Sequence, residues 1–150
     1  MRTKGHAPPV ERVVAVFSKL GEHGALWLAL SAAGAALSTG QRRRDFRDAG
    51  VTVAASFIAN QTVKLLVRRP RPDLPGLPPL IHTMSNRSYP SAHATTSAAG
   101  ARALCGLLPA PPIYAIAVAL AISRPYLGVH YPSDTVAGAV LGHAVARLRQ

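Results

Sequence analysis

Cysteine is almost absent from this chain, and its scarcity excludes two kinds of site. The one cysteine, Cys105, has no partner for an intrachain disulfide. It is also a poor candidate for a reactive thiolate, because such a group needs nearby positive charge. The segment that follows it, from Gly106 to Pro112, contains no basic residue.

Acidic residues are also few, six among 150 residues. Metal sites that act on phosphate need several carboxylates or histidines converging on the ions, and only Asp73 and Asp134 occur in the last 100 residues. The glycine-rich G-x-x-x-x-G-K-S/T loop that holds nucleotide phosphates is absent as well. The sequence therefore predicts no metal site and no cofactor.

Aromatic residues are too few for a nucleic-acid surface, although the formal net charge is +11. Trp27, Phe57 and Tyr114 lie in apolar runs and not among basic residues, where they could stack on bases. Basic clusters that bound apolar runs are typical of membrane surfaces, so we expect membrane lipids as partners and no nucleic acid. The three clusters occupy residues 42–44, 68–71 and 147–149.

Apolar runs and proline positions predict an all-α fold, a compact transmembrane helical bundle with an interfacial N-terminal helix. We expect residues 1–9 to form a flexible tail and residues 10–150 a single membrane-embedded domain. Prolines in residues 69–90 predict a long loop, and those in 109–112 a break between helices. The predicted helices and apolar spans are Val10–Leu20, Gly24–Gln41, Ala49–Val63, Ala92–Leu108, Ile113–Ile122 and Pro132–Leu148.

The first of these segments predicts an amphipathic helix that lies in the membrane interface. Its apolar residues recur every three or four positions, and its charged residues lie largely off that stripe. A soluble helix that packs the same stripe on a core is the alternative. The stripe consists of Val10, Val13, Val14, Phe17 and Leu20.

The other spans are short and rich in small residues. As a helix, Gly24–Gln41 reaches roughly 27 Å, slightly less than a hydrocarbon core of about 30 Å. Small residues let membrane helices approach closely, and the run Ala32–Ala36 and the pair Gly138 and Gly142 fit that use.

The first of three clusters of reactive residues contains Lys64 and Arg71. A lysine that closes a helix and an arginine seven residues later, in a loop bounded by prolines, can converge on one anion. Lysine offers a point charge, and arginine makes a two-pronged contact with phosphate oxygens. The alternative is a basic loop that flanks the membrane, for which Arg68 and Arg69 are good candidates.

The second cluster is Tyr89–His93. Pro90 precedes a predicted helix, so the amides of Ser91 and Ala92 are expected to point out of its N-terminus and to form an anion pocket. The Ser91 hydroxyl and His93, in the first turn, can contact the same ligand. Alternatively, Ser91 is a simple helix cap and His93 a solvated polar residue. His82, in the long loop, is a weaker candidate for substrate contact, and His23 is assigned no role.

The third cluster runs from Ser123 to Asp134. Asp134 lies four residues after His130 at the start of the last helix, where its carboxylate can accept a hydrogen bond from one ring nitrogen. The other nitrogen is then free as a nucleophile, and the carboxylate stabilises the cation formed on attack. Arg124 supplies another cation for phosphate oxygens. A surface His–Asp pair is the alternative.

Together the three clusters resemble the signature of the type-2 phosphatidic acid phosphatase, or lipid phosphate phosphatase, superfamily, which also includes vanadium haloperoxidases. Lys64 to Pro72 matches K-x6-R-P, and Ser123 to Asp134 matches S-R-x5-H-x3-D. Pro90 to His93 matches P-S-G-H except that Ala92 replaces glycine, which keeps the amide donor but forbids glycine-only torsions. The resemblance covers about residues 50–145.

This resemblance implies a helical, metal-independent phosphohydrolase that removes phosphate from a membrane lipid. His130 would attack phosphorus to give a phosphohistidine, with Asp134 orienting its ring, and His93 would protonate the leaving oxygen. The phosphate and the charge of the transition state would be held by Lys64, Arg71, Ser91 and Arg124.

The implied substrate is a prenyl-linked or glycerolipid phosphate. The Ala-rich chain, with its Arg-Pro-Arg-Pro-Asp segment, is also similar to actinobacterial members that act on decaprenyl-phosphoryl-phosphoribose. A vanadate-dependent haloperoxidase and a non-catalytic protein that binds anionic lipid are the alternatives.

We expect a multi-pass protein of the cell membrane. Family habit favours an extracytoplasmic site, although the basic residues divide almost equally between the two sides. Oligomeric state is not encoded in any of these patterns.

Overall fold

The structure, a computed structural model, describes residues 6–149, and these residues form an all-α fold with no strand among them. The predicted all-α class is therefore confirmed. In chain order the elements are α1 (Pro8–Lys19), the short 3-10 helix η1 (Glu22–Gly24), α2 (Ala25–Leu37), α3 (Gly40–Val67), α4 (Ala92–Leu104), α5 (Ala110–Tyr126) and α6 (Pro132–Leu148).

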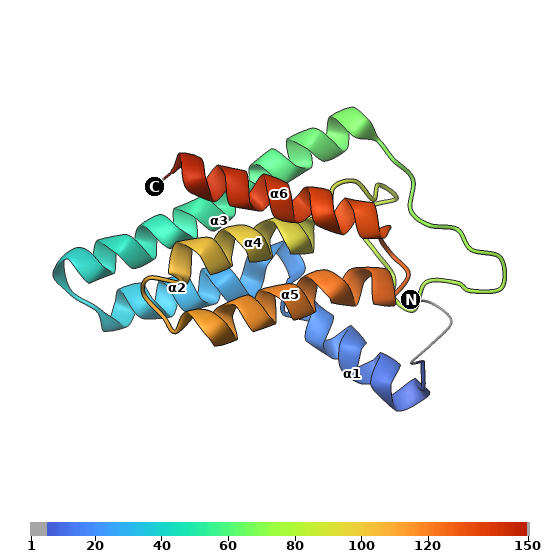
Figure 1. Cartoon of the computed structure of the whole chain (residues 1–150), viewed down its shortest axis with the longest axis horizontal. Helices are drawn as coiled ribbons and strands as arrows, with labels where there is room; N and C mark the ends of the chain where they lie inside the picture. Colours follow the sequence, from blue (N-terminus) through green and yellow to red (C-terminus); the bar gives the residue numbers. More distant parts are fainter. Residues whose placement is uncertain (1–5, 150) are drawn as a thin grey trace.

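Helix α4 lies at the centre of the bundle (Figure 1). It packs most extensively on α6, then on α3 and α5, while α2 packs mainly on α3. Nine of its thirteen residues are buried, and most of them are small or hydroxylated. A central helix with such short side chains allows its neighbours to approach closely on several sides.

The closest approach is between α4 and α6, at the two glycines that the sequence singled out. An ideal Cβ placed on Gly142 would overlap the backbone carbonyl of Thr95, and one on Gly138 would lie 2.5 Å from the carbonyl oxygen of Ser91. Only glycine therefore fits at these two positions of α6, so that α6 lies directly on the backbone of α4.

The apolar core lies at the other end of α4, where α2, α3 and α5 meet. Trp27 is its largest buried side chain. Its indole Nε1 donates to the hydroxyl of Ser97 at 3.0 Å, so the one polar atom of the ring is satisfied. Val53, Leu104 and Leu120 are fully buried around it.

Helix α1 projects from the end of the bundle opposite the α2–α3 turn (Figure 1). Most of its apolar side chains are exposed, with Val13 at 68% and Val16 at 61%, whereas Phe17 packs partly on the core; Ser18 is its only buried residue. The chain then bends through η1, where His23 and Gly24 adopt left-handed backbone conformations. Residues 1–5 of the predicted tail lie outside the described residues.

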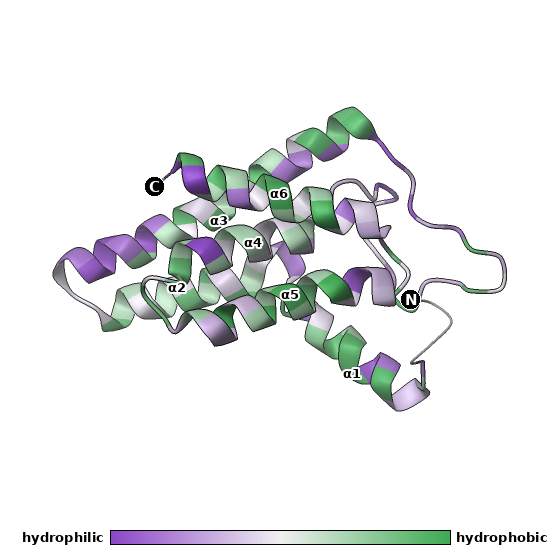
Figure 2. Ribbon diagram, in the orientation of Figure 1, coloured by the Kyte–Doolittle hydropathy of each residue, from purple (hydrophilic) through white to green (hydrophobic). Residues whose placement is uncertain are grey.

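Several predicted helix boundaries differ from the structure. Helix α3 begins at Gly40, whereas the sequence placed Gln41 at the end of the preceding span, so the basic residues 42–44 form its first turns. These arginines are exposed, and arginine favours the helix, so α3 continues beyond its apolar part. Figure 2 shows this end of α3 as hydrophilic. Pro111 and Pro112 lie in the first turn of α5, where proline is tolerated, rather than between helices.

One helix of the described chain, α3, is long and apolar enough to cross a membrane. Its 28 residues extend about 42 Å. Residues Pro8–Lys19 and Glu22–Leu37 pass the same test only together, as a pair bent by 42°. Helix α3 and this bent pair are therefore the elements that support the expected transmembrane bundle.

We expect Gly142→Ala to destabilise the protein by about 1–3 kcal/mol, because the added methyl meets backbone that cannot rotate away. Thermal unfolding in detergent should show a fall in Tm of roughly 2–12 °C. Gly106→Ala is the matched control, since a Cβ there meets nothing within 4 Å. Equal Tm values for the two variants would contradict the close α4–α6 contact.

Candidate active site

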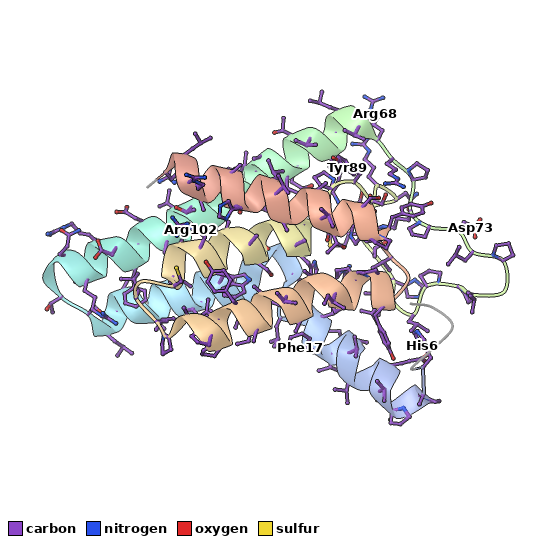
Figure 3. All side chains as sticks on the ribbon, viewed as in Figure 1. His6, Phe17, Arg68, Asp73, Tyr89 and Arg102 are labelled. Carbon is purple, nitrogen blue, oxygen red and sulfur yellow. The ribbon has the colours of Figure 1, made fainter. Side chains whose placement is uncertain are left out.

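The three sequence clusters meet at one end of the bundle. The end of α3, the loop 68–91 and the start of α4 come together there with the end of α5 and the start of α6. In Figure 3 the labelled side chains of Arg68, Asp73 and Tyr89 mark this end, and Arg102 of α4 lies away from it. A cavity of about 250 Å³, the site cavity, is lined here by six of the eight predicted site residues: Lys64, Arg71, Ala92, His93, Arg124 and His130.

His130 lies in the short connection between α5 and α6 with 4% of its surface exposed. Its Nδ1 is 3.5 Å from a carboxylate oxygen of Asp134, and its Nε2 is 3.3 Å from Nη1 of Arg71. Burial lowers the pKa of His130 to about 4, together with the positive charges of Arg71, Arg124 and Lys64 and against the opposing effect of the Asp134 carboxylate. The imidazole is therefore neutral near pH 7, with Nε2 directed at the cations.

Asp134 is completely buried, and each of its oxygens has a partner. One oxygen accepts from Nη1 of Arg69 at 3.0 Å, and the other from the backbone amide of Tyr131 at 2.9 Å. The predicted approach of Asp134 to His130 is observed, at a distance slightly longer than a hydrogen bond.

Arg69 is a residue whose role sequence reasoning missed, because it was assigned to the membrane-flanking loop. Its guanidinium bonds Asp134 and the Ser133 hydroxyl, and it lies 4.0 Å from the ring centroid of Tyr131. The sequence did contain one indication of this role. A carboxylate that is buried at the start of a helix, as Asp134 is, needs a cationic partner besides His130.

Arg71 and Lys64 are held by backbone carbonyls of the chain around them. Arg71 donates to the carbonyls of Ser85 at 2.7 Å and Val129 at 2.6 Å. Lys64, 6% exposed, donates to the carbonyl of Arg87 at 3.3 Å. Neutral carbonyls orient both cations and leave their charge available for an anion.

Ser91 departs from its predicted role. Its amide donates to the backbone carbonyl of Asp134 at 3.0 Å, so it is not free to bind an anion as expected. Its hydroxyl caps α4 by accepting from the amide of Ala94 at 3.5 Å, and the residue has no exposed surface. The close approach of α6 causes this difference, because the start of α6 covers Ser91. Ala92, next in the chain, does line the site cavity.

His93 and Arg124 share a partner that the sequence did not indicate. Nε2 of His93 lies 2.9 Å from the backbone carbonyl of Ser18, and Nη1 of Arg124 donates to the Ser18 hydroxyl at 2.8 Å. The Ser123 hydroxyl lies 3.2 Å from the same oxygen. Ser18 is the only buried residue of α1, and this helix contacts the site through both the backbone carbonyl and the hydroxyl of that residue. An isolated serine in an amphipathic helix carries no signal of such a contact.

Polar residues from outside the three clusters complete the wall of the site cavity. His82, which the sequence named as a weaker candidate, is among them, and so is His23, which was assigned no role. Glu22, Gln61, Thr83 and Ser85 also line the cavity. The sequence offered no reason to associate residues 22 and 23 with segments that follow them by more than 60 positions.

Comparison with known proteins agrees with this geometry. Residues 46–149 match the model of the PAP2 superfamily. The chain belongs to this superfamily. It is 42% identical over 135 residues to the decaprenylphosphoryl-5-phosphoribose phosphatase of Mycobacterium tuberculosis, covering 87% of this chain and 73% of that one. The protein of the same name from Mycolicibacterium smegmatis is 40% identical over 121 residues, covering 81% and 67%.

Two solved structures share the fold. A transmembrane PAP2-type phosphatidylglycerolphosphate phosphatase from Bacillus subtilis superposes with a TM-score of 0.80 at 27% identity, covering 97% of this chain and 77% of that one. A bacterial vanadium-dependent iodoperoxidase superposes with a TM-score of 0.74 at 19% identity, covering 89% and 42%; this second likeness concerns the fold alone. The prediction of a PAP2-type lipid phosphate phosphatase is confirmed, and the membrane neighbour together with α3 supports a membrane location.

We expect Arg69→Ala to lower kcat for a lipid phosphate by about tenfold, equivalent to about 1.4 kcal/mol of transition-state stabilisation. The variant removes a partner of the buried Asp134 carboxylate, which then orients His130 less well. KM should change little, because Arg69 does not line the site cavity. The neighbouring Arg68→Ala is the control, since the Arg68 guanidinium donates to the carbonyl of Leu65 in its own helix and does not line the site cavity. An unchanged kcat in Arg69→Ala would refute this positioning role.

Proposed function

We propose that this protein dephosphorylates a prenyl-linked sugar phosphate, through a covalent intermediate on His130. The observation that carries the proposal is the site cavity itself, where a buried neutral imidazole faces three cations. The identity of about 40% to two phosphatases of decaprenylphosphoryl-5-phosphoribose supports the choice of substrate. A prenyl-phosphoryl-ribose that carries a terminal phosphomonoester is the corresponding substrate class.

In the first step, Nε2 of His130 attacks the phosphorus of the monoester. The phosphate oxygens are bound by Lys64, Arg71 and Arg124, which stabilise the charge of the transition state. The imidazole becomes cationic as the N–P bond forms, and the Asp134 carboxylate, 3.5 Å from Nδ1, stabilises that charge. Buried Nε of Arg124 has no hydrogen-bond partner within the described residues, as suits a donor that binds a substrate oxygen.

His93 serves as the general acid of this step. With Nε2–H donating to the Ser18 carbonyl, Nδ1 is the atom that delivers a proton to the leaving sugar oxygen. Burial and the positive charge of Arg124 lower the pKa of His93 to about 3 in the free protein. The Ser18 carbonyl opposes this effect, and the negative charge of a bound phosphate opposes it as well, which favours the protonated ring in the substrate complex. A water molecule then attacks the phosphohistidine, His93 accepts its proton, and inorganic phosphate leaves with His130 restored.

In this proposal the negative charge of the phosphate is neutralised by side chains alone. Lys64 and Arg124 are 6% and 5% exposed, and Nη1 of Arg71 lies 3.3 Å from Nε2 of His130. All three cations line the site cavity. Cations in a site with little water act on the phosphate far more strongly than they do in solution. The proposed reaction is therefore independent of metal ions.

The protein is proposed to cross the membrane several times, with the site on the extracytoplasmic side. Helix α3 and the bent α1–α2 pair supply the apolar elements for this arrangement. The site then lies at the opposite end of α3 from the exposed arginines at 42–44. Because basic residues occur at both ends, the choice of the extracytoplasmic side follows family habit and not the distribution of charge.

Purified protein should release inorganic phosphate from a short-chain prenyl-phosphoryl-phosphoribose in the presence of EDTA. His130→Ala should lower kcat by roughly a thousandfold or more, because it removes the nucleophile. His143→Ala, an exposed histidine of α6, is the control and should retain activity. Brief reaction with labelled substrate should leave acid-labile phosphate on the wild-type protein only.

Full activity of His130→Ala would overturn the nucleophile assignment. Halide oxidation with added vanadate, in place of phosphate release, would favour a haloperoxidase. Lipid binding without turnover would favour a non-catalytic protein.

The proposed orientation can be tested with two single-cysteine variants on a Cys105→Ala background. Asp73→Cys lies in the exposed loop at the site end, and Arg43→Cys in the exposed first turns of α3. In intact cells an impermeant maleimide should label the first variant, and it should label the second only after permeabilisation. The reverse pattern would place the site on the cytoplasmic side.

A further inference from the structure

A second cavity adjoins the site cavity. This side chamber, of about 400 Å³, lies between α1 and the loop residues 81–82. Three residues line both spaces, namely Glu22, His82 and Arg124. Arg124, a proposed phosphate ligand, therefore borders both spaces, so a ligand that extended from the site cavity into the side chamber would pass this residue.

The size of the site cavity indicates that it holds only part of the substrate. Its volume of about 250 Å³ is below the range of about 300–1,000 Å³ usual for small-molecule sites. A phosphomonoester bound by the lining cations occupies part of this space. The remainder of a sugar-linked lipid needs a neighbouring compartment, and the side chamber is the space that shares residues with the site cavity.

The charges of the side chamber suit a second anion. Arg12 and Lys19, both exposed residues of α1, line it. Within residues 6–149 neither of them forms an ion pair. Glu22 is an acidic residue that lines both the side chamber and the site cavity. A carboxylate there repels a phosphate but accepts hydrogen bonds from hydroxyl groups.

We propose that the side chamber is a second anion subsite, which binds the phosphodiester between the sugar and the prenyl chain. Arg12 and Lys19 bind the diester, and Glu22 and His82 bind the sugar hydroxyls between the two phosphates. This inference rests on the proposed function and concerns its substrate class, a lipid with two phosphates separated by a hydroxylated spacer. It also assigns α1 a direct part in substrate selection.

The apolar part of the side chamber provides an exit for the prenyl chain. Ala15, Val16 and Ile81 line it beside the two cations. Val16 is 61% exposed and continues into the uncovered apolar face of α1, where Val13 is 68% exposed. A chain attached to a diester in the chamber can therefore leave along this face, which suits insertion into lipid.

The test compares two substrates on the full-length enzyme in detergent. One is a short-chain prenyl-phosphoryl-phosphoribose, and the other is a prenyl monophosphate, which lacks both the sugar and the second anion. In the double variant Arg12→Ala/Lys19→Ala, KM for the first substrate should rise about tenfold relative to KM for the second. The control Arg43→Ala/Arg47→Ala removes the same charge from the exposed far end of α3 and should leave this ratio unchanged.

A binding measurement separates this proposal from the proposed function. Prenyl-phosphoryl-ribose contains the diester but no monoester, so its affinity reports on the side chamber without turnover. The double variant should weaken its equilibrium Kd about tenfold relative to wild type, and the control should not. An unchanged Kd, or an equal rise in KM for both substrates, would overturn the second subsite. Absence of phosphate release from wild-type protein, with the expected Kd change, would instead contradict only the proposed reaction.

Discussion

The direct contact between α4 and α6 is the constraint on which the rest of this structure depends. With glycine at positions 138 and 142, the two helices meet backbone to backbone. The amide of Ser91 can then donate to the carbonyl of Asp134, which joins the first turns of both helices. Because His93 lies in one of those turns and Asp134 in the other, this contact sets the separation of the proposed acid and nucleophile. Larger residues on α6 would move the two halves of the site apart.

A second constraint is the attachment of α1 to the site through Ser18. Amphipathic helices ordinarily bury their apolar side, yet α1 exposes Val10, Val13 and Val16 and buries a serine. That serine holds His93 with its carbonyl and Arg124 with its hydroxyl. Residues far from the three sequence clusters thus determine the geometry of two site residues. The same helix brings Arg12, Lys19 and Glu22 beside the cavity, and so connects phosphate chemistry with the recognition of the lipid.

Much of the fold and most of the site could be predicted from the sequence. Proline and apolar patterning located all the long helices, and α6 begins and ends at the predicted residues. Six of eight predicted site residues line one cavity, and Asp134 lies directly behind His130. The start of α3 was wrong because charge was interpreted as a boundary, whereas arginines in water extend a helix without cost. The free amide predicted at Ser91 was wrong because local helix-end geometry contains no information on what covers that end.

The spacing of residues within each short block determined the chemistry of this protein, because an imidazole four residues before a carboxylate, or a cation at a helix end, is a local relation along the chain. Only the tertiary structure decided which distant groups support that chemistry. Arg69 beside Asp134, Ser18 beside His93 and the chamber beneath α1 depend on how helices cross. Helix crossing follows from packing over the whole surface of each helix, and no short motif encodes it.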